Sequence, residues 1–203
     1  MVLCCTYIPE TYFLRFFFLP ADACNLTFNP NSAHRELCLS ELNRKVSYTA
    51  QAMQYPDHPD RFQLLSQVLC NESLSQRCYW EVCLEDSLPE IGITYPNFQR
   101  KQEDLAVWDG QIKLGLNPVS WALCFSYKGY TVRHNSEDTV IEMPKSNRIA
   151  VYLDWPAGIL SFYNVSSDTH RLTHIHTFRT TFRESVYPGF SVDNGSLTLC
   201  QLE

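Results

Sequence analysis

The sequence lacks the glycine-rich loops with which many enzymes hold phosphate groups. Only 7 of its 203 residues are glycine, and the patterns G-x-x-x-x-G-K-[ST], G-x-G-x-x-G and G-x-S-x-G do not occur. The first two patterns cradle phosphates with backbone N–H groups, and the third presents a nucleophilic serine. No spacing singles out a Cys–His pair as a nucleophile and its base either. We therefore predict that the chain is not an enzyme and needs no cofactor.

Positive charge is also scarce. The chain has 16 Lys and Arg against 22 Asp and Glu, a formal net charge of −6. The longest basic pairings are Arg44-Lys45 and Arg100-Lys101, which are too short to follow a phosphate backbone. A nucleic-acid-binding surface needs clustered positive charge. The composition thus predicts no nucleic-acid partner.

Long hydrophobic runs are missing. The apolar stretch 13–20 is far shorter than the roughly 20 residues that span a bilayer, so no membrane insertion is expected. As a signal peptide this region is poor, because Glu10 precedes the apolar stretch and Arg15 interrupts it. Ala21-Asp22-Ala23 nevertheless imitates a cleavage site, which keeps a secreted protein as an alternative. We interpret residues 1–23 as an N-terminal extension or linker remnant with short helical turns near 8–19.

The nine cysteines include no C-x-x-C, the spacing typical of zinc-ribbon and thioredoxin sites. Several lie in apolar, strand-like runs, and we interpret these as small buried hydrophobes in a reduced cytosol: Cys38, Cys78, Cys83, Cys124 and Cys200. A disulfide framework is the alternative. Four N-x-S/T sequons would matter only in a secreted protein, and we interpret them as loop asparagines: Asn25, Asn71, Asn164 and Asn194.

The residues that are abundant point to one folded β domain. Hydrophobic residues make up 45% and charged residues 19%, with 12 Phe, 11 Tyr and 4 Trp. Short alternating segments separated by turn residues predict an all-β, two-sheet antiparallel sandwich. The expected strands are 26–28, 36–40, 45–49, 67–71, 78–85, 90–95, 112–116, 120–127, 129–134, 148–154, 159–165, 172–178, 187–192 and 196–202. Helical turns are expected only near 8–19, 31–36 and 60–66.

The segment Val151–Tyr163 carries the most information. It predicts a strand, a turn built on Asp154, Pro156 and Gly158, and a second strand. Its sequence, LDWPAG followed by SFYN, resembles the central LDYEAG…SFYN signature of the SPRY (B30.2) domain. Leu26–His34 resembles the opening LDPxTA motif of the associated PRY segment, with Asn29 where Asp is usual. Cys78–Val82 resembles the WEVE motif, which here continues into Cys83 rather than Glu.

This resemblance covers about residues 24–202 and is similar to fish PRY-SPRY domains of tripartite-motif proteins, NOD-like receptors and stonefish-toxin-like proteins. It implies a bent, concanavalin-like sandwich in one domain, 24–203, with PRY at about 25–75 and SPRY at about 76–203. It also implies a protein- or peptide-recognition module at the C-terminus of a larger cytoplasmic protein of innate immunity or ubiquitin signalling. A secreted or toxin-like subunit is the first alternative, and a carbohydrate- or metal-binding sandwich is the second.

Partner-binding residues are expected in loops at one edge of the sandwich. The candidate loops are 50–66, 85–90, 96–111, 126–131, 135–147 and 166–171. In loop 96–111 the candidates are Phe98, Arg100 and the anchor Trp108, for which burial in the core is the alternative. The resemblance implies that Cys124, Ser126, Tyr127 and Tyr130 lie at or near the floor of a binding groove, where the family often has larger aromatics. Asp154 is interpreted mainly as a turn cap and alternatively, with Trp155, as a peptide contact.

Two further clusters could carry chemistry, and we interpret both as structural. His174 and His176 would share one face of a strand and form a metal pair, but no third ligand is evident, so no metal site is predicted. The carboxylates Glu81, Glu85, Asp86 and Glu90 surround the Ser87–Pro89 turn. We expect them to form a solvated acidic rim rather than an acid–base pair.

Overall fold

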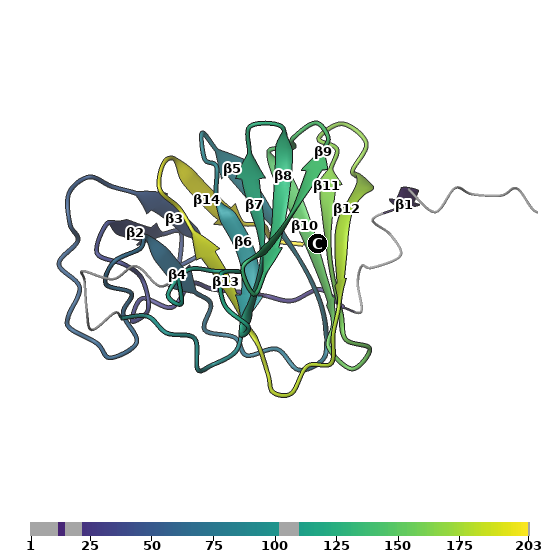
Figure 1. Cartoon of the computed structure of the whole chain (residues 1–203). Helices are drawn as coiled ribbons and strands as arrows, with labels where there is room; N and C mark the ends of the chain where they lie inside the picture. The colour runs from purple at the N-terminus through teal and green to yellow at the C-terminus, as the bar shows by residue number, and fades with distance from the viewer. Residues whose placement is uncertain (1–11, 15–21, 102–109, 203) are drawn as a thin grey trace, which may run out of the picture.

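Two antiparallel sheets pack face to face (Figure 1). The structure is a computed structural model that describes residues 22–101 and 110–202, together with the backbone of 12–14. The described part of the chain contains strands, turns and irregular segments but no helix. The predicted all-β, two-sheet antiparallel sandwich is therefore confirmed.

The larger sheet has eight strands in the order β1-β12-β11-β10-β5-β14-β3-β2. Its central strand β5 pairs with β10 on one side and with β14 on the other. The strands are β1 (Tyr12–Leu14), β2 (Leu37–Ser40), β3 (Lys45–Tyr48), β5 (Arg77–Glu85), β10 (Arg148–Asp154), β11 (Ile159–Val165), β12 (Arg171–Arg179) and β14 (Ser196–Leu199).

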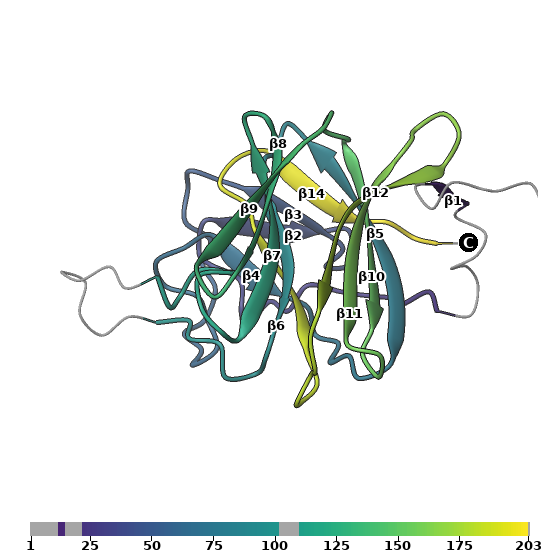
Figure 2. The same ribbon diagram turned by 45° about the vertical axis from the view of Figure 1, so that its right-hand side comes forward.

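The smaller sheet has six strands in the order β4-β13-β6-β7-β8-β9, so β9 is an edge strand. Figure 2 shows β6–β9 in front of β2, β3 and β14, with the other labelled strands of the larger sheet to their right. The strands are β4 (Gln67–Leu69), β6 (Glu90–Thr94), β7 (Ser120–Ser126), β8 (Gly129–His134), β9 (Glu137–Glu142) and β13 (Tyr187–Ser191).

Alternation along each strand fills the space between the sheets. On β5 the side chains of Trp80, Val82 and Leu84 belong to the central hydrophobic cluster, while Tyr79 belongs to a separate cluster on the outer face. On β7 Leu123 belongs to the central cluster, and Cys124 lies on the opposite side. Successive side chains of a strand point to opposite faces, so one face of each sheet is buried against the other.

The β10–β11 turn has the predicted chemistry. Asp154 Oδ1 accepts a hydrogen bond from the backbone N–H of Ala157 at 3.1 Å, and Arg77 Nε donates to Asp154 Oδ2 at 3.0 Å. Gly158 adopts a φ of 69°, and a Cβ at this position would overlap the carbonyl oxygen of Thr180. Turn capping by Asp154 is thus confirmed, and glycine is required two residues after Pro156.

Several predicted boundaries were wrong. Residues 137–142 form strand β9, although we expected a loop over 135–147; its polar, exposed sequence suits an edge strand. Segment 112–116 forms turns instead of a strand. Of the helical turns expected near 8–19, the described residues 12–14 form β1 beside β12, and the others lie outside the described part of the chain. Segments 31–36 and 60–66 form turns and irregular chain rather than helix.

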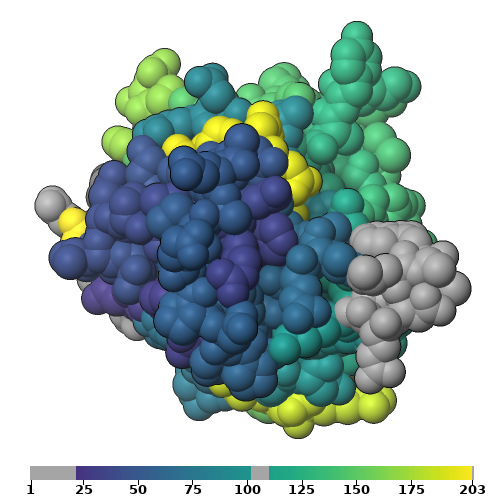
Figure 3. All heavy atoms as spheres, turned by 90° about the vertical axis from the view of Figure 1, so that its left-hand side faces the viewer, coloured from purple at the N-terminus to yellow at the C-terminus, as the bar shows by residue number. Residues whose placement is uncertain are grey.

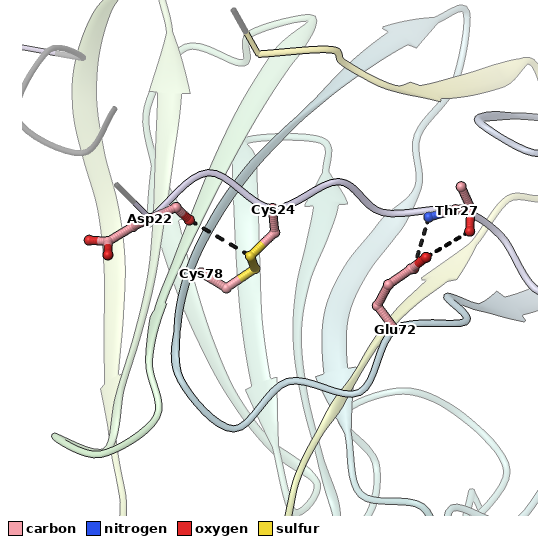
Figure 4. The surroundings of a disulfide bond; sticks show 5 residues. All are labelled: Asp22, Cys24, Thr27, Glu72 and Cys78. Carbon is pink, nitrogen blue, oxygen red and sulfur yellow. Dashed lines mark hydrogen bonds between the residues drawn. A yellow bond between two sulfur atoms is a disulfide. The ribbon is translucent and has the colours of Figure 1, made fainter. Parts of the chain in front are cut away.

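The interpretation of Cys78 as a free core thiol was also wrong, because a disulfide joins it to Cys24 across 54 residues of sequence (Figure 4). The backbone N–H of Cys24 donates to the Tyr79 carbonyl at 3.0 Å, which brings the segment ahead of the PRY motif alongside β5. Further on, both oxygens of the Glu72 carboxylate accept from Thr27, at 2.9 Å and 2.8 Å. The first described segment is therefore fixed to the sandwich covalently and by charge-assisted hydrogen bonds.

Replacing Cys24 with serine should lower the free energy of unfolding by about 2–4 kcal/mol, because the disulfide restricts the unfolded chain. Urea unfolding followed by tryptophan fluorescence measures the difference. In reductant the variant and the wild-type chain should unfold at nearly the same midpoint. A Cys38→Ser variant, which alters a half-buried thiol outside this disulfide, is the matched control. A deficit in Cys24→Ser that persists in reductant would contradict this account.

Candidate functional site

The outer face of strands β6–β9 is the strongest candidate for a binding site. Opposed residues form a row across the four strands: Glu90 faces Cys124, Cys124 faces Thr131, and Thr131 faces Val140. Cys124 is only 6% exposed, whereas Val140 on the edge strand is 57% exposed. The row therefore runs from a covered floor to an open apolar edge.

The covered part of this face is roofed by neighbouring segments. Cys124 and Ala122 belong to one cluster with Phe62, Phe98 and Leu114. The rings of Phe62 and Phe98 meet edge to face with centroids 5.8 Å apart. Figure 3 shows the N-terminal segments, in purple and blue, gathered on one face of the molecule. These contacts hold the PRY segment and the start of loop 96–111 against the six-stranded sheet.

A charged network crosses the same face. Lys113 Nζ lies 3.0 Å from Glu90 Oε1, and Arg133 reaches the same oxygen at 3.6 Å. Arg133 also donates to both oxygens of Asp138, at 2.7 Å and 3.0 Å. Burial raises the pKa of Glu90, and the two cations oppose that rise. The hydrogen bond with Asp138 raises the pKa of Arg133, while the same bond lowers the pKa of Asp138.

Two acceptors near this face have no partner among the described residues. Glu90 Oε2 and Ser126 Oγ are both buried and make no hydrogen bond. A buried polar atom without a partner destabilises a protein by about 1–3 kcal/mol. Both atoms lie beneath the surface, so in this conformation neither offers an acceptor to a ligand. The part of this face that a partner can reach is apolar Val140 with the charged side chains beside it.

The turn between β7 and β8 extends this face. Tyr127 is 99% exposed, and Lys128 Nζ lies 3.1 Å from Glu142 Oε1 on β9. An aromatic ring that is apolar over most of its surface and carries one polar tip is well suited to an interface. Tyr127 thus stands next to the outer face as an accessible anchor. Its role in partner binding stays a prediction.

Other predicted contact residues are placed differently. Phe98 is 3% exposed, and Tyr130 is fully buried with its hydroxyl bonded to Asn164 Oδ1 and to the backbone N–H of Ser146. Arg100 is held by Asp60 at 2.6 Å. Phe98 packs on the covered part of the outer face, and Tyr130 lies in the central core. Neither side chain offers surface to a partner. Trp108 lies outside the described residues.

Asp154 and Trp155 lie at the opposite end of the sandwich from Tyr127. Strand register shows this, because Asp154 pairs with Arg77 at the start of β5, whereas the end of β5 leads to Glu90 opposite Cys124. Trp155 donates from Nε1 to the Glu184 carbonyl at 2.9 Å and stacks on Phe182. The structure therefore does not bring these two residues together with Cys124, Ser126 and Tyr127.

The predicted acidic rim was wrong for two of its four members. Glu81 is fully buried, where it accepts from the Tyr79 hydroxyl at 2.6 Å and from Arg148 Nε at 2.5 Å. Glu90 is part of the network described above, and only Glu85 and Asp86 are solvated. Alternation along β5 puts Glu81 on the outer face, but the sequence does not show that Arg148 on β10 lies beside it.

The two histidines that we considered as metal ligands, His174 and His176, are not part of a group of three or more ligand-type side chains among the described residues. His174 Nε2 lies 2.8 Å from Thr177 Oγ1, and burial lowers the pKa of both His174 and His176. Over residues 22–101 and 110–202, no three His, Cys, Asp or Glu side chains gather in a way that would hold a metal ion. A search of the same part of the chain finds no helix of the length and apolarity needed to cross a membrane.

Family models match most of the chain. The PRY (SPRY-associated domain) model matches residues 26–74, and the SPRY domain model matches residues 77–201. Stonustoxin subunit alpha of Synanceia horrida is 38% identical over 87% of this chain and 25% of its own length. Tripartite motif-containing protein 16 of Mus musculus is 38% identical over 83% of this chain and 29% of its own length. This chain thus spans about a quarter of the length of these curated relatives.

Solved structures agree with the sandwich. The TRIM65 PSpry domain superposes with a TM-score of 0.82 and 29% identity, covering 97% of this chain and all of that domain. The stonustoxin structure superposes with a TM-score of 0.78 and 36% identity, covering 88% of this chain and 29% of that one.

Replacing Arg133 with glutamine should destabilise the fold by about 1–3 kcal/mol at neutral pH, because Glu90 and Asp138 lose their shared cation. The deficit should shrink as the pH falls through the folded-state pKa of Glu90, which burial raises, since a protonated carboxyl needs no cation. The lowered pKa of Asp138 acts in the same direction, because its stabilising contribution is lost in acid.

Urea midpoints of the wild-type and Arg133→Gln chains at several pH values test this prediction. Lys128→Gln removes an exposed pair with Glu142 and should leave the midpoint nearly unchanged. A deficit in Arg133→Gln that is constant with pH would show that lost packing of the arginine, rather than lost charge, causes it.

Proposed function

The chain belongs to the SPRY family and carries its associated PRY segment, and from this premise we propose that it recognises a protein or peptide through the outer face of β7–β9 and the adjoining turn 126–129. The observation that carries the proposal is the combination of exposed Val140 and Tyr127 with the charged pairs Lys128–Glu142 and Arg133–Asp138 on the same strands. Apolar anchors surrounded by a few placed polar groups are typical of interfaces that bind with specificity.

The scaffold supports this role. The outer face lies on regular strands whose inner side chains are packed in the core, so its residues are fixed before a partner arrives. Such preorganisation reduces the conformational entropy lost on binding. Exposed Val140 on the edge strand β9 and the adjoining Tyr127 suit an extended segment of chain better than a compact small molecule.

We place this module in a longer cytoplasmic protein of innate immunity or ubiquitin signalling, where it would select the target. In support, the relatives include E3 ubiquitin-protein ligase TRIM65 of Mus musculus, of which the matched region covers 32%. Any activity would then belong to other domains of such a parent. The recognition domain itself would be non-catalytic.

Selection of binders from a displayed peptide library tests the binding face. Selected peptides should lose at least about tenfold in affinity for Tyr127→Ala and for Val140→Asp, because each change removes apolar contact at the proposed centre. Leu42→Asp, an equally exposed apolar residue on the β2–β3 turn of the other sheet, should bind normally. Selected peptides whose affinity falls for Leu42→Asp but not for Tyr127→Ala or Val140→Asp would refute this placement.

A toxin-like secreted subunit is a second candidate function. The Cys24–Cys78 disulfide favours it, because disulfides persist mainly in oxidising compartments, and so does the similarity to stonustoxin subunit alpha. Thiol trapping in the cells of origin separates the two candidates. In a cytoplasmic parent Cys24 and Cys78 should be alkylated as free thiols without reductant. A protected pair together with glycosylation at Asn71 or Asn194 would instead support secretion.

A further inference from the structure

A second pair of cysteines lies on the outer face of the eight-stranded sheet. Cys83 points outward from β5, and Cys200 follows directly after β14, the neighbouring strand. Their sulfur atoms are 2.6 Å apart, and both residues are half-buried. Figure 2 shows the yellow segment after β14 continuing away from that strand on the side of β5 and β10. The pair joins the end of the fold to its central strand.

The surroundings favour a thiolate at Cys83. The hydrogen bond with Cys200 and the positive charge of Arg148 lower the pKa of Cys83 to about 7, against the effect of burial and of the carboxylates Glu81 and Glu85. The thiolate is the nucleophile in exchange with disulfides, and a thiol whose pKa lies near the ambient pH attacks fastest. Arg148 on β10 stands directly opposite Cys83 in the strand register, so we assign Cys83 as the attacking member of the pair and Cys200 as the member that resolves.

The pair opens into a cavity of about 490 Å³. Arg44 provides positive charge in its lining and Glu41 provides one negative charge, while the charge of Arg148 is already paired with Glu81. Guanidinium groups bind carboxylates well, and a single carboxylate suits an ammonium group. The charges around the cavity thus match a small molecule that carries carboxylates and an amine.

We propose that Cys83 and Cys200 form a disulfide-exchange site for a small, carboxylate-bearing disulfide of the glutathione type. The Cys83 thiolate attacks one sulfur of the small disulfide, forms a mixed disulfide and releases one small thiolate. Cys200 then gives up its proton to that thiolate, attacks the Cys83 sulfur and releases the second small thiol, which takes up the proton first lost by Cys83. The protein dithiol is oxidised by two electrons, and the small disulfide is reduced to two thiols.

The consequence is a covalent closure of the outer face. Leu202 packs against the outer cluster that contains Tyr79 and Tyr163. A Cys83–Cys200 disulfide would hold the segment 200–202 over β5, next to the ion pair of Glu81 and Arg148. The site lies on the other sheet from the proposed partner-binding face, so the redox reaction and partner binding can be tested separately.

The experiment treats the full chain, reduced and freed of reductant, with oxidised glutathione, then alkylates remaining thiols and maps them by mass spectrometry. The Cys83–Cys200 link should form first. Cys200→Ser should instead accumulate glutathione on Cys83, and Cys83→Ser should react at Cys200 at least about tenfold more slowly. Cys38, half-buried and outside both pairs, is the internal control for reactivity caused by exposure alone.

The charge match is tested with Arg44→Gln. Its reaction with oxidised glutathione should slow about fivefold, whereas its reaction with the uncharged disulfide of 2-mercaptoethanol should be almost unchanged, because only the former offers carboxylates. Modification of Cys38 as fast as Cys83 would overturn the exchange site. Equal slowing with both disulfides would overturn the assignment of a carboxylate-bearing ligand.

Discussion

The burial of one apolar side of each sheet against the other is the interaction on which the molecule depends. β5 is central to it, because Trp80, Val82 and Leu84 fill the space between the sheets while the strand pairs on both sides. Roughly 25 cal/mol for each Å² of apolar surface removed from water makes this burial the dominant stabilising term. Since alternation assigns every second residue to the core, the remaining residues of the same strands are free to carry chemistry on the outer faces.

The two outer faces use that freedom differently. On the six-stranded sheet the charges of Glu90, Lys113, Arg133 and Asp138 neutralise one another, and apolar Val140 is left at the open edge. On the eight-stranded sheet the ion pair of buried Glu81 with half-buried Arg148 lies beside two thiols. The first arrangement suits recognition of another chain. The second suits a reaction, because a fixed cation beside a thiol favours its ionised form.

Sequence reasoning predicted most of the fold and less of the site. Alternation and turn residues identified the β10–β11 hairpin with its Asp154 cap, because those signals act over a few neighbouring residues. They failed for β9, because nearly all of its residues are exposed and most are polar, so its sequence resembles that of a loop. They also failed for Glu81 and for the Cys24–Cys78 disulfide, because each depends on a partner 54 or more residues away. Trp108 was chosen as an aromatic residue among charged residues of a long loop; it lies outside the described residues, so its role stays a prediction.

Both cysteine pairs end on β5, and this position decides what each can do. Cys78 points into the core at the start of the strand, so its disulfide to Cys24 is shielded and acts on stability. Cys83 points outward near the end of the strand, beside Arg148 and an open cavity, so its pairing with Cys200 responds to small molecules. The alternation that builds the core thus separates a structural disulfide from a reactive pair five residues further along one strand.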